Sequence, residues 1–133
     1  MDQSSRSTSV ASLDIATLKA TLEAVGDEQG EVLAILLETF QGHTPEMLQA
    51  MVTAVRGRDT KMLRRGAHTL KSSSATLGAL QLSHLCEVIE QSNLEEQFEA
   101  TQILVTQAQH EYEHVNQALG TYLRALQNSS NAL

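Results

Sequence analysis

Apolar side chains recur at steps of three and four residues through most of this chain, and this helical period restricts its fold more than any other feature. Aromatic residues make up only 3% of the sequence, while Leu and Ala together supply about a quarter, as is typical of helices. The longest regular run lies between about Glu95 and Gln127, with the seam of a bundle helix at Phe98, Val105, Ala108, Tyr112, Val115, Leu119, Tyr122 and Leu126. The sequence therefore predicts an all-α protein.

Capping residues and glycines divide this pattern into five helices, at about 15–25, 27–56, 60–77, 79–92 and 95–127. Asp14 and Asp59 are the expected caps of the first and third helices, and Gly78 is the expected left-handed stop after the third. Pro45 falls inside the second helix, where it either produces a kink or follows Thr44 at a fresh helix start; the continuous apolar register favours the kink. Short breaks imply antiparallel neighbours, so we expect an up-down-up-down four-helix bundle with the short N-terminal helix covering one end. The domain is expected to span 13–127, between a flexible arm at 1–12 and a flexible tail at 128–133.

Net charge, hydropathy and cysteine content indicate the cellular location and the kinds of ligand to expect. A net charge of −7 argues against nucleic-acid binding, and the longest apolar run, Val32 to Leu37, is far short of the roughly 20 residues that span a bilayer. The single cysteine, Cys86, cannot form an intrachain disulfide, and no secretory signal opens the chain. We expect a cytoplasmic protein that binds neither nucleic acid nor membrane.

The basic residues are concentrated in one short stretch of an otherwise acidic chain. Six of the nine lie within sixteen positions: Arg56, Arg58, Lys61, Arg64, Arg65 and Lys71. A local positive field of this kind predicts an anionic ligand or partner.

A histidine stands in the middle of this field. Helical geometry directs one face of the third helix to the core, namely Met62, Leu63, Gly66, Leu70, Ser73 and Leu77, and points His68 almost directly away from it. Lys61, Arg64, Arg65 and Ser72 lie within about 60° of His68, with Lys71 at the margin. Ser72 is small enough to leave room for a partner, and its hydroxyl could bond a phosphate oxygen. Neighbouring cations disfavour the imidazolium, so the residues predict a neutral, nucleophilic ring that gains counterions once phosphorylated.

The stretch from Ala67 to Ala79 resembles the signature of histidine-containing phosphotransfer (HPt) domains. An acceptor-type histidine is followed by Leu70 and Lys71, then by small residues, and then by Gly78 ten positions on; Arg64 and Arg65 precede it. The resemblance implies that His68 carries a phosphoryl group, that Lys71 helps to neutralise it, and that Gly78 serves a helix end or close approach.

The same resemblance implies the partners. A receiver domain of a response regulator or hybrid sensor kinase would donate the phosphoryl group from an aspartyl phosphate, and another receiver would accept it. Mg²⁺ is expected in the receiver, while this chain, an expected monomer, would bind no cofactor or metal and act as a carrier rather than an enzyme. Family members often have Gly at the position of Ser72, and several have Gln near Glu90, which leaves open whether Glu90 or Gln91 contributes.

Two other interpretations compete with this one. His110 and His114 with Glu111 form an H-E-x-x-H pattern, but no Asp, Glu, His or Cys follows His114 to supply a third zinc ligand. We therefore do not predict a zinc peptidase. A helical adaptor that docks a partner without chemistry would share the predicted fold and is the alternative function.

Overall fold

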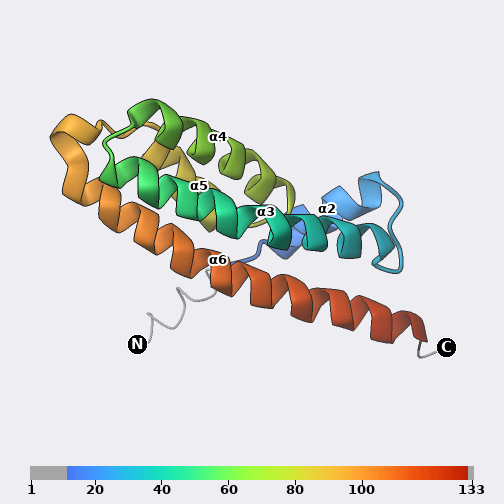
Figure 1. Ribbon diagram of the computed structural model, residues 1–133. Helices are drawn as coiled ribbons and strands as arrows, with labels where there is room; N and C mark the ends of the chain where they lie inside the picture. The colour runs from blue at the N-terminus through green and yellow to red at the C-terminus, as the bar shows by residue number, and fades with distance from the viewer. Residues whose placement is uncertain (1–11, 132–133) are drawn as a thin grey trace, which may run out of the picture.

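The computed structural model describes residues 12–131, and this range holds five helices and no strand. The helices are α2 (Ile15–Ala24), α3 (Glu31–Arg56), α4 (Thr60–Thr76), α5 (Leu80–Glu90) and α6 (Leu94–Asn131) (Figure 1). Contacts run from α3 to α4, α4 to α5, α5 to α6 and back to α3, which closes the ring of a four-helix bundle. The predicted all-α class is confirmed.

The N-terminal helix α2 packs beside one end of this bundle. Leu18 and Leu22 are its buried residues, and the Thr21 hydroxyl donates a hydrogen bond to the Thr76 carbonyl at the end of α4, at 2.9 Å. In Figure 1, α3 and the C-terminal part of α6 extend together past the other bundle helices, and α2 lies next to this extension. The prediction that the short helix covers one end of the bundle is thus confirmed.

Two helix boundaries differ from those expected. α3 begins at Glu31 rather than near Asp27, because the Asp27 carboxylate accepts from the Gly30 and Leu33 amides, at 3.1 and 2.9 Å, and so caps α3 across a short loop. α6 continues to Asn131, so the tail predicted from residue 128 is helical over its first four positions. Each added residue gains a backbone hydrogen bond and no Gly or Pro stops the helix there. Residues 1–11 and 132–133 of the predicted arm and tail lie outside the described range.

Pro45 does not end the helix that contains it. α3 is continuous from Glu31 to Arg56, so the alternative of a new helix starting at Thr44 is wrong. The apolar register that runs through Pro45 correctly indicated a single helix.

The core face of α4 is rotated slightly from the predicted one. Leu63, Leu70 and Leu77 are buried as expected, but Met62 is 45% exposed and Ser73 is also exposed. Ala67 and Ser74 are buried in their place. Since α4 packs against both α3 and α5, its buried stripe is centred between these two neighbours, which the sequence of α4 alone does not specify.

Candidate functional site

His68 is held on the outer face of α4 by anchors on the opposite face. Asp59 caps the helix by accepting from the Met62 amide at 3.1 Å, and the fully buried Leu63 and Leu70 fix its rotation. The His68 side chain consequently remains 67% exposed, one turn before the exposed Ser72. The predicted outward orientation of His68 is confirmed.

A carboxylate from the neighbouring helix contacts His68 directly. Glu90, the last residue of α5, places Oε2 2.8 Å from Nδ1 of His68 and Oε1 2.8 Å from Nζ of Lys71. The Glu90 side chain is only 25% exposed. The three side chains, which we call the His68–Glu90–Lys71 cluster, therefore join α4 to α5 through one bridging carboxylate.

Lys71 and Glu90 shift each other's pKa in the directions that favour an ion pair. The hydrogen bond to Glu90 raises the pKa of Lys71, while desolvation opposes the rise. The hydrogen bond from Lys71 lowers the pKa of Glu90, and the contact with His68 lowers it further against desolvation. Lys71 and Glu90 are thus both charged around neutral pH.

Hydrogen bonds join α4 to α5 and to the connection after α5 on both sides of this cluster. The Ser83 hydroxyl of α5 donates to the Lys71 carbonyl of α4 at 2.9 Å, and Arg64 Nη2 of α4 donates to the Ser92 carbonyl, just after α5, at 3.2 Å. Ile89, next to Glu90, is fully buried. These contacts fix the end of α5 opposite His68.

The basic residues of α4 and of the turn before it have different neighbours. Arg64 is directed to the α5–α6 connection, and Arg58, with φ 54°, places its guanidinium 4.0 Å from the centre of the Phe98 ring at the start of α6. Lys61 and Arg65 are exposed on α4, as expected. The charged group that contacts His68 is a carboxylate, so the electrostatic surroundings of the ring are mixed rather than wholly positive.

Sequence reasoning left the contribution of Glu90 open, and the structure places it in the cluster. Gln91 is the exposed C-cap residue of α5, and its described backbone contacts are to α5 itself. The indication of a side chain at this position came from the family resemblance, because several family members carry Gln near it. Gly78, the predicted left-handed stop, has φ 81° and closely approaches the backbone of Asp14.

In the part of the chain that the structure describes, the other titratable residues form no comparable site. His110 and His114 are exposed on α6, and residues 12–131 contain no group of three His, Cys, Asp or Glu side chains able to hold a metal ion. Cys86 is buried, and desolvation raises the pKa of its thiol to about 12, so it is a poor nucleophile. No helix in the described part of the chain is long and apolar enough to span a membrane.

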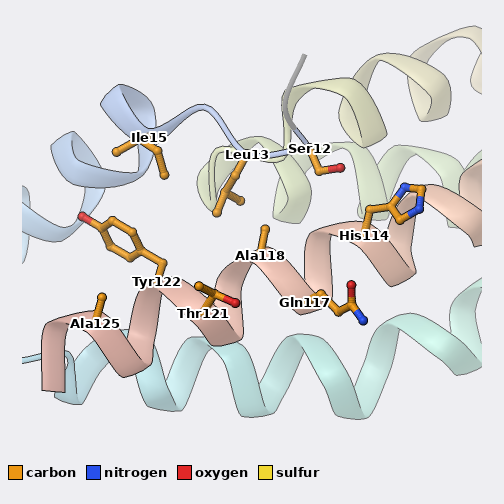
Figure 2. Close-up of a pocket in the computed structure, with 9 residues that line it drawn as sticks. All are labelled: Ser12, Leu13, Ile15, His114, Gln117, Ala118, Thr121, Tyr122 and Ala125. Atoms are coloured by element: carbon orange, nitrogen blue, oxygen red, sulfur yellow. The ribbon is translucent and has the colours of Figure 1, made fainter. Parts of the chain in front are cut away.

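The larger cavities do not include the cluster. A cavity of about 580 Å³ lies between α6 and the start of α2, lined by residues such as Leu13, Ile15 and Tyr122 (Figure 2). A second, of about 430 Å³, lies between α3 and α4 and is lined by Phe40 and Met47, among others. Neither contains a grouping of catalytic side chains, so within residues 12–131 the His68–Glu90–Lys71 cluster is the stronger candidate site.

Comparison with known proteins defines the class. The family model of the Hpt domain matches residues 35–128, which include the whole His68–Glu90–Lys71 cluster. The chain therefore belongs to the Hpt domain family, whose members are phosphoryl carriers in phosphorelay signalling and partner with receiver domains.

Two relatives illustrate this class. The crystal structure of histidine-containing phosphotransfer protein B (HptB) from Pseudomonas aeruginosa PAO1 is similar, with a TM-score of 0.74 and 26% identity over 85% of this chain and 95% of that one. Sensor protein TorS of Escherichia coli (strain K12) is 32% identical over 83 residues, which are 62% of this chain and 9% of TorS. The chain thus corresponds to a small part of that sensor protein.

Proposed function

We propose that His68 is the phosphoacceptor of this domain and that its Nε2 atom carries the phosphoryl group. The observation that supports this most strongly is the geometry of the ring: the side chain is exposed, while Nδ1 is occupied by the Glu90 carboxylate at 2.8 Å. The other ring nitrogen is then the one available to a partner. The geometry meets the requirement for a nucleophile that a second protein can reach.

The chemistry requires little more from this chain. In the accepting step, the Nε2 lone pair forms a bond to phosphorus, and the bond from phosphorus to the aspartyl oxygen of the donor receiver breaks. The receiver supplies the carboxylate leaving group and, we propose, the Mg²⁺ that neutralises charge on the phosphoryl oxygens. The domain contributes a positioned nucleophile, and transfer to a second receiver reverses the same bond changes.

The surroundings of His68 suit this role. Lys61 and Arg65 are exposed on the same helix and provide a positive field for an anionic aspartyl phosphate, and Ser72 adds little bulk one turn away. The proposal includes the receiver domain of a response regulator or hybrid sensor kinase as partner, a monomeric state and a cytoplasmic location.

Transfer from a panel of phosphorylated receiver domains tests the proposal. Radiolabel should move to the wild-type domain and to His84→Gln, because His84 is an exposed α5 histidine outside the cluster, but not to His68→Gln. Equal labelling of His68→Gln and wild type would overturn the assignment. Stable receiver binding without labelling in any pairing would favour the adaptor alternative.

A further inference from the structure

We propose that His110 and His114 of α6 form a surface site for a divalent transition-metal ion, Zn²⁺ or Ni²⁺. The two histidines belong to the H-E-x-x-H segment, which the proposed function leaves without a role. The site needs two protein ligands rather than the three of a zinc peptidase, and so departs from the sequence-based expectation that this chain binds no metal. It lies outside the His68–Glu90–Lys71 cluster and does not depend on the role of His68.

Helical geometry brings both imidazoles to one face of α6. The helix is regular from His110 to His114, and side chains four positions apart lie one turn apart on the same side. Both side chains are exposed, so a hydrated ion can reach them. In Figure 2 the His114 ring extends along α6 away from Tyr122 and Ala125, toward the preceding turn of the helix. His110 lies on that turn, and the two rings can therefore chelate one ion.

A buried carboxylate lies behind His114. Glu111 Oε1 is 3.7 Å from Nδ1 of His114, and the Glu111 side chain is only 9% exposed. Its Oε2 atom is buried and has no hydrogen-bond partner among residues 12–131. A buried carboxylate oxygen without a partner is unfavourable, so a positive charge on the neighbouring ring would stabilise it. A metal-ligating histidine typically donates its other ring N–H to a carboxylate, and Glu111 is placed to accept from Nδ1 while Nε2 binds the ion.

The charge of α6 favours a cation at this position. Glu113 is exposed between the two histidines. The one basic residue of α6, Arg124, is about 15 Å along the helix from His114. All other charged residues of the helix are acidic, namely Glu95, Glu96, Glu99, Glu111 and Glu113. A dication near His110 and His114 therefore meets attraction from its own helix.

The ligand atoms determine the class of ion. Imidazole nitrogen suits Zn²⁺, Ni²⁺ and Cu²⁺, whereas Mg²⁺ prefers oxygen ligands and retains its water. Residues 12–131 offer no third His, Cys, Asp or Glu to complete a group of three, so water molecules would fill the remaining coordination positions. The ion would be exchangeable. Because it binds the folded helix, it should raise the Tm of the domain.

Three variants and one matched control test the inference. His110→Gln and His114→Gln each remove one ligand, and Glu111→Gln removes the charge behind His114. His84→Gln is the control, because His84 is exposed and its Nδ1 lies 4.0 Å from Glu87 Oε1, but no second histidine lies one turn away on α5. Far-UV circular dichroism and metal-free melting curves establish that each variant is folded.

The first readout is isothermal titration calorimetry with ZnCl₂ in an excess of Mg²⁺. Wild type and His84→Gln should bind one Zn²⁺ per chain. Each ligand variant should lower the affinity at least about tenfold, and Glu111→Gln should lower it about tenfold without a lower metal-free Tm. Equal affinities of wild type and the His110→Gln/His114→Gln double variant, or no binding by wild type, would overturn the inference. An unchanged affinity in Glu111→Gln would contradict the orienting role of Glu111.

The second readout is the Tm with and without ZnCl₂, and it separates this site from the phosphoacceptor. Zn²⁺ should raise the Tm of wild type and of His68→Gln equally, and leave that of the double variant unchanged. Loss of the rise in His68→Gln would place the ion at His68 and overturn the inference. Failure of His68 to accept a phosphoryl group, with Zn²⁺ binding intact, would count against the proposed function alone.

Discussion

Replacing Gly78 by alanine should destabilise the domain through a close contact between the α4–α5 turn and the start of α2. Gly78 has φ 81°, and a Cβ atom there would lie 2.7 Å from the Asp14 carbonyl oxygen and 3.2 Å from the Leu18 amide nitrogen. Both atoms belong to the backbone, so no side-chain rotation relieves the contact. The Asp14 amide also donates to the Gly78 carbonyl at 2.7 Å, and this bond is disturbed if α2 moves away.

The expected cost has two parts. The left-handed conformation costs a residue with a Cβ atom about 1 kcal/mol relative to glycine, and forcing an extra carbon into a packed contact adds about 1–3 kcal/mol. The free energy of unfolding should therefore fall by about 2–4 kcal/mol, which corresponds to a decrease in Tm of about 8–16 °C for a domain of this size.

Gly26 provides the matched control. It has a similar φ of 73°, but nothing lies within 4 Å of an added Cβ, so Gly26→Ala should cost only the conformational part, about 1 kcal/mol. Thermal and urea unfolding followed by circular dichroism measure both variants. Equal losses for Gly78→Ala and Gly26→Ala would show that α2 yields to the added carbon, and would refute the close-approach argument.

Three further predictions concern the cluster and its surface. Lys71→Ala removes the ion pair with Glu90 and a cation near the phosphoryl group, so the phosphohistidine half-life should shorten several-fold with helicity unchanged. An unchanged half-life at low and physiological salt would exclude a role of Lys71 in stabilising the phosphorylated form. Ser72→Arg adds a long side chain one turn from His68, so receiver transfer should fall sharply at an unchanged Tm, and wild-type transfer rates would show that the partner approaches from another side. Because the pKa of Glu90 is lower in the folded protein, its ionisation stabilises the fold above the unfolded-state pKa of about 4.3, and this contribution is lost as the pH falls through the folded-state pKa. The urea midpoints at pH 7 and pH 3 should therefore differ less in Glu90→Gln than in wild type. Equal differences in the two proteins would contradict this contribution.

Local signals predicted most of the fold. Asp14 and Asp59 cap the helices that follow them, and Gly78 adopts the left-handed conformation after α4, because these effects depend on a few neighbouring residues. The start of α3 was placed four residues early because Asp27 caps it from a distance, through the Gly30 turn. That geometry depends on the loop and is not encoded in a simple spacing.

The site was only partly predictable for a different reason. The outward direction of His68 follows from the helical period of α4, but its contact with Glu90 joins residues 22 positions apart on two helices. The rotation of α4, which buries Ala67 and exposes Met62, and the diversion of Arg64 to Ser92 likewise depend on how α4 packs against α5. Properties of one helix were thus accessible from the sequence, and properties of a helix pair were not.

The most direct test of the central claim is to locate the phosphoryl group after transfer. The domain is incubated with a phosphorylated receiver, and the modified nitrogen is identified by fragmentation mass spectrometry under conditions that preserve the bond between nitrogen and phosphorus, together with ³¹P NMR. We expect one phosphoryl group per chain, on Nε2 of His68, and none on His43, His84, His110 or His114. A phosphoryl group on any of those four histidines, or on Nδ1 of His68, would contradict it.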